Sequence, residues 1–128
     1  MANKKRGCNA ERELLHLLSK AKFAVARVAG SGMMSETSCD LFAGNSKNKY
    51  AIEVKISSND KKYFNKEQIQ ELMSFAKSFG LKPIVAIKFL RQGWWFIEPK
   101  KLDKTKKALM ISLNKIQKKG KNFEQFIS

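Results

Sequence analysis

Asp40 and the tripeptide Glu53-Val54-Lys55 are the residues whose types and spacing best suit a chemical reaction. Successive side chains of a strand point to opposite faces, so Glu53 and Lys55 share one face of a strand predicted over 51–56, and the apolar residues face the core. A hairpin beginning at Asp40 brings a second carboxylate beside them. Carboxylates are hard oxygen ligands of the kind that Mg²⁺ prefers, and a lysine neutralises a phosphate or positions a water. The pattern predicts a site that cuts phosphodiesters.

The same tripeptide has a plainer interpretation, because alternating charge on a solvated strand face is ordinary in sheets. Three features favour chemistry over this alternative. Asp40 opens an apolar run that does not require an acid, its distance along the chain from Glu53 suits a tight hairpin, and Glu11 begins an amphipathic helix upstream. Together they make the pattern more specific than the tripeptide alone.

The charge balance points to an anionic partner. The 128 residues include 26 Lys and Arg against 11 Asp and Glu, a formal charge of +15. So positive a field does not help folding, and nucleic acid is the favoured partner. An anionic membrane is the alternative, but no apolar run approaches the roughly 20 residues of a spanning helix and no signal peptide is seen, so we expect a cytosolic, single-domain protein. Cys8 and Cys39 suggest no disulfide framework, and the lone His16 makes a Ser/His/Asp site improbable.

The amino-terminal elements are expected to place basic groups near the acids. Residues 1–8 form a basic arm that is either a solvated tail or a phosphate contact. Asn9 is predicted to cap a helix with Glu11 and Arg12 in its first turn. The helix dipole favours an acid there but not Arg12, so Arg12 is expected to face a phosphate.

The middle of the chain is expected to build the hairpin. A strand is predicted over 22–28, followed by a glycine-flanked loop over 30–38 that either responds to DNA or merely connects. Residues 44–48 turn the hairpin, and the polar run 57–62 is predicted as a loop.

A helix capped by Asn65 and ended by Gly80 follows. Its apolar stripe is wider than one sheet contact needs, so the excess is expected to pack against another subunit. Pro83 starts a buried central strand that pairs with an aromatic strand over 94–98.

The carboxyl-terminal part is rich in lysine. Residues 100–121 hold nine lysines against the single acid Asp103. Within them, 108–113 is predicted as a short edge strand, and Asn122 is predicted to cap a terminal turn over 123–127.

The order helix, three strands, helix, two strands, with acid, acid and Glu-x-Lys so placed, resembles the PD-(D/E)xK nucleases of the restriction-endonuclease-like superfamily. More closely, the chain is similar to the archaeal Holliday junction resolvases of the Hjc type over about residues 4 to 98. Cys39 departs from the proline that the superfamily often has before the aspartate, which leaves the ligand itself unchanged. The matching pieces are Arg6-Gly7, Ala10 to Leu14, Phe23 to Arg27, Gly30 to Gly32, Asp40 to Gly44, Ile52 to Lys55, Phe75 to Phe89 and Gly93 to Glu98.

This resemblance implies an α/β fold with a restriction-endonuclease-like core, a central mixed five-stranded sheet flanked by helices. The chain is then one nuclease domain over 1–128, with the basic arm 1–8, a core over 9–98 and a lysine-rich extension over 99–128. The implied function is a structure-specific, metal-dependent endonuclease that resolves four-way DNA junctions by paired nicks in opposing strands. The alternatives are another nuclease of the superfamily, such as a nickase or flap endonuclease, and a non-catalytic basic DNA-binding protein.

The resemblance also implies roles for single residues. Asp40, Glu53, the carbonyl of Val54 and Glu11 are expected to bind Mg²⁺, with Mn²⁺ as a substitute and no small-molecule cofactor. Lys55 is expected to assist the attacking water, and Ser31 matches the active-site loop serine of the family. The expected DNA contacts are Lys4, Lys5, Arg6, Arg12, Arg27 and Lys88, and the expected homodimer interface comprises Leu72, Phe75 and Phe79.

Overall fold

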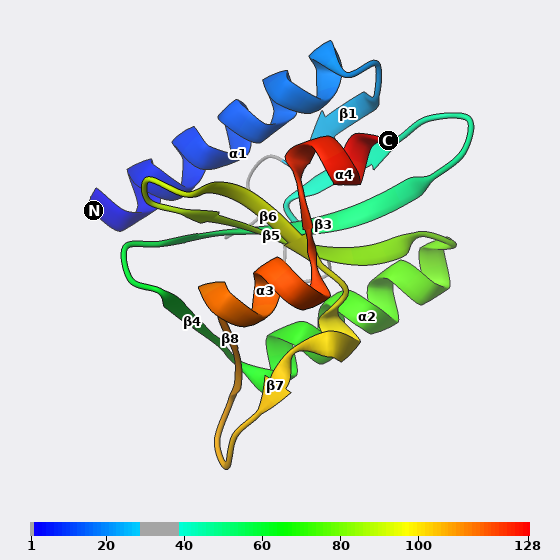
Figure 1. The fold of residues 1–128 in the computed structure, drawn as a ribbon. Coiled ribbons are helices and arrows are strands. Elements are labelled where there is room, and N and C mark those ends of the chain that lie inside the picture. The colour runs from blue at the N-terminus through cyan, green and yellow to red at the C-terminus, as the bar shows by residue number, and fades with distance from the viewer. Residues whose placement is uncertain (1, 29–38) are drawn as a thin grey trace.

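The computed structural model describes residues 2–28 and 39–128, and side chains from Arg6 onward within those ranges. Two sheets and four α-helices make up the described part (Figure 1). The large sheet runs in the order β1 (Ala24–Arg27), β2 (Leu41–Gly44), β3 (Lys49–Ser57), β5 (Lys82–Phe89), β6 (Gly93–Ile97), β9 (Lys121–Asn122). The small sheet runs in the order β4 (Lys61–Phe64), β8 (Leu109–Ser112), β7 (Asp103–Lys104). The helices are α1 (Ala2–Lys20), α2 (Lys66–Phe79), α3 (Leu113–Lys119) and α4 (Phe123–Ile127), with a short 3₁₀ turn over Pro99–Lys101.

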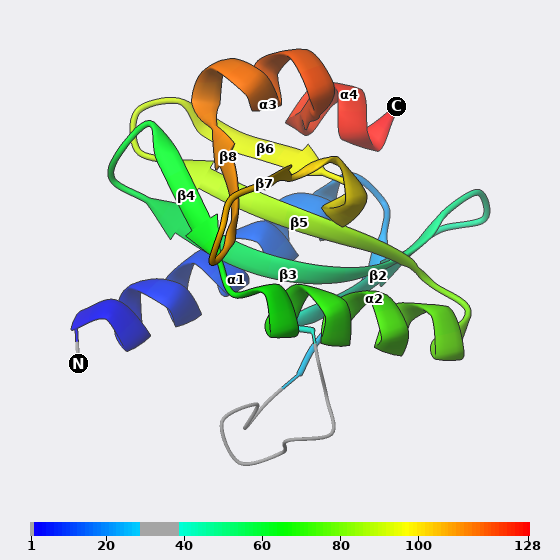
Figure 2. The same ribbon diagram turned by 90° about the horizontal axis from the view of Figure 1, so that it is seen from below.

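The large sheet is mixed and buried on both faces. β3 pairs in parallel with β5, and the other pairings in this sheet are antiparallel. One core cluster joins α1 and α4 to the sheet, with Leu14 and Phe126 among its buried residues. A second cluster joins α2 and α3 to the opposite face, with Leu72 and Ile116 among its buried residues. Figure 2 shows the resulting layers, with α2 and the small sheet in front of the large sheet and α1 behind it.

Helix α1 corrects the prediction of a basic arm capped by Asn9. The helix begins at Ala2, so residues 2–8 are already helical. Lysine and arginine are good helix formers, and the apolar stripe that includes Leu14 and Leu18 anchors the helix to the sheet, with both leucines fully buried. Asn9 therefore lies inside the helix as an exposed residue and not at its start.

Helix α2 confirms the predicted caps. The Asn65 side chain accepts hydrogen bonds from the backbone N–H groups of Glu67 and Gln68, at 2.8 and 3.2 Å. Gly80 ends the helix in the left-handed conformation with φ +86°, which glycine adopts without a Cβ penalty. Leu72 is 1% exposed inside its own chain, so its predicted place in a subunit interface is wrong, whereas Phe79 is 62% exposed.

The strand count and the second half of the chain differ from the sequence prediction. Short β9 pairs with β6 and makes six strands in the large sheet where five were expected. The run predicted as a loop over 57–62 contains the end of β3 and the start of β4. β8 is the central strand of the small sheet, not an edge strand, and α3 was not predicted. Each of these short elements depends on a partner far away in sequence, which local patterns do not reveal.

Within the described residues, no helix has both the length and the apolar character needed to cross a membrane.

Candidate active site

A cavity of about 770 Å³ gathers the residues on which the sequence prediction rests. Glu11 reaches it from α1, Arg27 from β1, Asp40 from the residue before β2, and Glu53 and Lys55 from β3. These side chains come from segments up to 44 positions apart (55 − 11), and the fold brings all of them to one space. The loop containing Ser31 lies outside the described residues.

The hairpin fixes Asp40 beside β3. The Asp40 backbone N–H donates to the Ile52 carbonyl at 2.9 Å, and Leu41 pairs with Ile52 in the ladder. One carboxylate oxygen of Asp40 then accepts a hydrogen bond from the Val54 N–H at 2.8 Å. Because the donor is a backbone group of β3 itself, the Asp40 carboxylate is held in register with the Glu53-Val54-Lys55 segment.

The structure does not support the alternative interpretation in which Glu53 and Lys55 share a solvated strand face. Ala51 shares the face of Glu53 and is fully buried in the core cluster that includes α2. Further along the strand the same face opens into the cavity, where the side chains of Glu53 and Lys55 keep 21% and 31% of their exposure. Glu53 and Lys55 therefore lie on β3 just beyond the part of the strand that the core cluster with α2 buries.

Burial disfavours the charged form of both carboxylates at this point. Burial raises the pKa of Glu53 to about 7, and the neighbouring charge of Asp40 acts in the same direction. Burial also raises the pKa of Asp40, although the Val54 N–H and the Lys55 charge oppose that shift. Lys55 Nζ lies 3.3 Å from Glu53 Oε2 and compensates only part of the negative charge. A pair of partly desolvated carboxylates with raised pKa values is a site where a cation lowers the free energy.

Glu11 is engaged by a different partner. Its Oε1 accepts a hydrogen bond from Arg27 Nε at 2.8 Å, and Arg27 Nη2 lies 3.2 Å from Cys8 Sγ. Burial raises the pKa of Glu11, and the charge of Asp40 adds to the shift, which reflects how close the two acids are. Among the residues that the structure describes, no three His, Cys, Asp or Glu side chains are grouped so that they could hold a metal ion. In this structure Glu11 is thus an ion-pair partner, and the available carboxylate pair is Asp40 and Glu53.

Of the remaining predicted DNA contacts, some line the cavity and others lie outside it. Arg6 lines the cavity, while Arg12 is exposed on α1 outside its lining. Lys88 binds Glu13 through an ion pair of 2.6 Å and does not line the cavity. The side chains of Lys4 and Lys5 lie outside the described part of the chain.

Strand β4 supplies a cavity wall that the sequence prediction missed. Lys61, Lys62 and Tyr63 all line the cavity. Sequence reasoning assigned the first two to a loop, because a polar run preceded them. The signal that could have identified the strand is the tyrosine and phenylalanine that follow the lysines, since aromatic residues favour strands.

Comparison with known proteins identifies relatives over most of the chain. Residues 2–128 match the family described as archaeal Holliday junction resolvase (Hjc). The chain is 39% identical over 108 residues to the crossover junction endodeoxyribonuclease Hjc of Archaeoglobus fulgidus, covering 84% of this chain and 79% of the relative. It is 47% identical over 85 residues to the enzyme of the same name from Methanocaldococcus jannaschii, covering 66% and 60%.

A solved structure agrees with these matches. The Holliday junction resolvase Hjc of A. fulgidus superposes with a TM-score of 0.86 at 34% identity, covering 95% of this chain and 100% of the other. The family match continues to residue 128 and so includes the lysine-rich segment, which the sequence resemblance had left out. The chain belongs to the archaeal Holliday junction resolvase (Hjc) family.

Proposed function

We propose that this chain is a metal-dependent endonuclease that binds four-way DNA junctions and resolves them by paired nicks in opposing strands. The observation that carries the proposal is the convergence of Asp40, Glu53 and Lys55 on one cavity, in a member of a family named for this activity. The net charge of +15 suits a polyanionic substrate. Because the proposed substrate is DNA, the proposed location is the cytosol.

The residues of the cavity fit a divalent cation. Asp40 and Glu53 offer hard oxygen donors whose pKa values are raised by burial, and the carbonyl of Val54 is the proposed further ligand to Mg²⁺ or Mn²⁺. When bound, such a cation supplies Lewis-acid stabilisation of the phosphoryl oxygens and a water of lowered pKa. Waters complete the coordination of Mg²⁺ in most protein sites, so two carboxylates suffice without Glu11.

The basic groups of the cavity have separate tasks. Lys55 is placed 3.3 Å from Glu53, and we assign it to the attacking water and to the charge that develops on the cleaved phosphate. Arg27 is oriented by Glu11, and Arg6 lines the same cavity, so both are proposed to hold flanking phosphates. Phosphate contacts of this kind position the strand and carry no base preference.

Cutting two opposing strands calls for two active sites, and we propose a homodimer for this reason. A four-way junction has pseudo-twofold symmetry, which an isologous dimer matches. The proposed interface is an aromatic group on and beside α2, in which Phe42, Phe75 and Phe79 have ring centroids 5.2 to 6.0 Å apart. Phe79 in this group is 62% exposed, which is unusual for so large an apolar side chain.

Phe79→Ser tests the dimer. The variant is expected to sediment as a monomer at micromolar concentration, whereas wild type sediments as a dimer. Tyr63→Ser is the matched control, because Tyr63 is similarly exposed, at 58%, but lies on β4. A monomeric wild type, or equal dissociation of both variants, contradicts the proposed interface.

Cleavage of defined DNA tests the activity. Purified protein is incubated with four-way junctions, flaps and linear duplexes, with Mg²⁺, with Mn²⁺ and with EDTA. We expect paired cuts in the junction only when metal is present, and binding without cleavage by Asp40→Asn. Equal cutting of all three substrates favours a general nuclease of the same fold, and binding without any cleavage favours a non-catalytic DNA-binding protein.

A further inference from the structure

Lys62 is a cation of the cavity to which no role has yet been assigned. β4 alternates between exposed Lys61 and Tyr63 on one face and partly buried Lys62 and buried Phe64 on the other. The Lys62 side chain therefore extends from the inner face of the strand, and it lines the same cavity as Glu53 and Lys55. Figures 1 and 2 place β4 and the amino-terminal end of α1 on the same side of the molecule.

Among the residues that the structure describes, no acid forms an ion pair with the Lys62 ammonium. Within the described part of the chain, six ion pairs occupy carboxylates, and none of them involves Lys62. Burial lowers the pKa of Lys62, and the positive charge of Lys55 lowers it further. A partly buried ammonium that faces a second lysine without a counter-charge is unfavourable by itself and becomes favourable when an anion enters.

The position of Lys62 is fixed by the backbone around it. Ser57, the last residue of β3 and 5% exposed, donates from Oγ to the Lys61 carbonyl at 2.7 Å and accepts from the Asn59 N–H at 3.2 Å. The Leu113 N–H also donates to the Asp60 carbonyl at 2.7 Å. The Ser57 bonds tie the start of β4 to the strand that carries Glu53 and Lys55, so the backbone of Lys62 is held beside the cavity.

The carboxyl-terminal extension completes this support. β8 pairs antiparallel with β4, with Ile111 opposite Lys62, and Ile111 is fully buried. Within the described residues, β8 is the one strand that pairs with β4, so the extension keeps the β4 wall in place.

We propose that Lys62, which lines the cavity together with Lys55, binds a phosphate of the DNA strand being cut. The carboxyl-terminal extension holds Lys62 in this position by pairing with β4. This inference rests on the proposed function, because it assigns the strand in the cavity as DNA. Lys55 stays with the reacting phosphate and Lys62 contacts another phosphate of the same strand, so Lys62 sets the register of the strand.

Removal of the charge at position 62 tests the proposal. Lys62→Met is compared with wild type for binding of a four-way junction in EDTA at several salt concentrations, and for single-turnover cleavage with Mg²⁺ at saturating enzyme. Because the proposed dimer carries two copies of Lys62, the substitution removes two phosphate contacts from each junction, which reduces the slope of log K against log salt by about 1.8 and weakens binding by more than about tenfold near 0.1 M salt. Cleavage is expected to slow by at least about tenfold, since a strand held in the wrong register reacts poorly.

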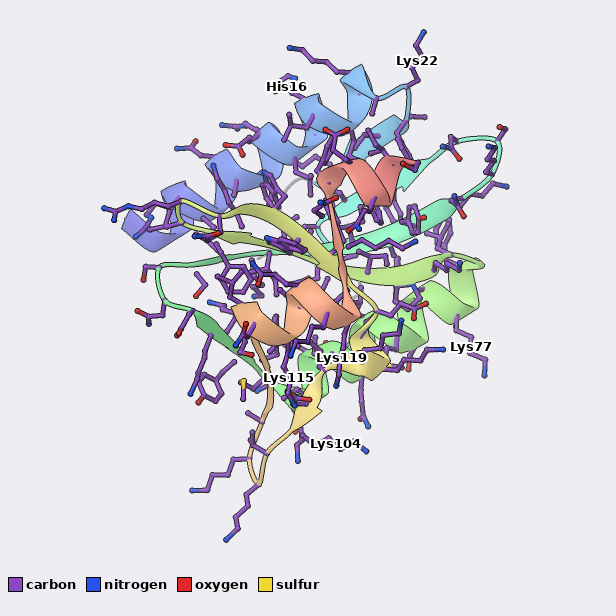
Figure 3. The ribbon with its side chains drawn as sticks, viewed as in Figure 1. His16, Lys22, Lys77, Lys104, Lys115 and Lys119 are labelled. Atoms are coloured by element: carbon purple, nitrogen blue, oxygen red, sulfur yellow. The ribbon has the colours of Figure 1, made fainter. Side chains whose placement is uncertain are left out.

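Two variants separate a phosphate contact from other effects. Lys104→Met removes the same charge from exposed β7 at the edge of the small sheet, away from the cavity lining (Figure 3), and is expected to keep the wild-type slope and rate. Lys62→Arg keeps a phosphate-binding cation and is expected to restore both, which a purely structural role for the lysine does not predict.

The outcomes are distinct from those of the proposed function. If wild type neither binds nor cuts the junction, the proposed function fails. If wild type cuts but Lys62→Met keeps its slope and rate, or if Lys104→Met is equally impaired, the assignment of Lys62 is overturned. Should Lys62→Met fail to fold by circular dichroism, the arginine variant decides, because failure of a folded Lys62→Arg to match wild type also overturns the assignment.

Discussion

Partly buried acids in two regions of this molecule have pKa values shifted in opposite directions. At the cavity, burial raises the pKa of both Asp40 and Glu53, the charge of Asp40 raises that of Glu53 further, and Lys55 offsets only part of these shifts. On α1, Glu13 accepts hydrogen bonds from Lys88 Nζ at 2.6 Å and from Trp94 Nε1 at 2.7 Å. Burial acts to raise the pKa of Glu13, but these two bonds outweigh it and lower the pKa.

The difference separates a residue that stabilises the fold from residues that we propose take part in the reaction. Glu13 connects α1 to β5 and β6 through Lys88 and Trp94, so its charge stabilises the packing of three elements. Asp40 and Glu53 are only partly compensated, by Lys55 and the Val54 N–H, and their raised pKa values leave the cation-free protein less stable at neutral pH than it could be. Active sites commonly carry this kind of cost, because the groups are arranged for a ligand and not for the fold.

The largest expected effect comes from removing one cavity acid. Glu53→Gln should reduce single-turnover junction cleavage with Mg²⁺ by about three orders of magnitude or more, because it removes a metal-binding oxygen and a transition-state contribution of several kcal/mol. Junction binding should persist. Glu13→Gln is the matched control, since it makes the same chemical change outside the cavity and should cleave within about threefold of wild type. Similar loss in both variants contradicts the separation of roles.

The sequence allowed the proximity of Asp40 and Glu53 to be predicted, but not the hydrogen bonds of Glu13 with Lys88 and Trp94. Asp40 and Glu53 lie in one hairpin, and the local signals of strand alternation and a turn predicted it. The caps of α2 and the terminal turn at Asn122 are equally local and were also predicted correctly. Glu13 finds its partners 75 and 81 residues away, and no pattern near it in the sequence indicates them.

The same argument explains the missed cavity wall. β4 has four residues and owes its conformation to β8, which begins 45 positions after Phe64. Its intrinsic strand preference is weak because two of the four residues are lysines. Sequence reasoning therefore predicted that Asp40, Glu53 and Lys55 lie close together, as the cavity lining shows, but it did not predict that β4 adds Lys62 to the cavity wall.

A smaller effect is expected on stability when the Glu13 connection is broken. Glu13→Gln leaves Lys88 without its acid, and a hydrogen bond to a charged group contributes about 1.5 to 3 kcal/mol when buried. The Glu13 side chain is 41% exposed, so solvent screening reduces the expected loss to about 1 to 2 kcal/mol. Thermal unfolding should show the midpoint lowered by about 3 to 8 °C. Glu71→Gln, an exposed residue of α2 that makes no ion pair in the described structure, should leave the midpoint unchanged.

The cavity acids also predict a pH dependence of the metal-free protein in a range where Glu13 does not titrate. The pKa of Glu53 is raised from 4.5 to about 7, so the folded state binds a proton more tightly than the unfolded state does. Its contribution to stability is therefore fully present below pH 4.5 and is lost as the pH rises through about 7. Asp40 and Glu11 have raised pKa values and act with the same sign, whereas Glu13, with a lowered pKa, loses its contribution only under more acidic conditions.

Urea unfolding in EDTA between about pH 5 and 8 measures this dependence. We expect the free energy of unfolding to fall across that range in wild type and to fall much less in Glu53→Gln, because the glutamine removes the group that titrates near pH 7. Addition of Mg²⁺ at about pH 8 should restore wild-type stability and leave Glu53→Gln unaffected, since a cation bound only by the folded state stabilises it. A wild-type protein that gains stability over the same pH range without metal contradicts the electrostatic account of the cavity, because it implies that Asp40 and Glu53 are as well compensated as Glu13.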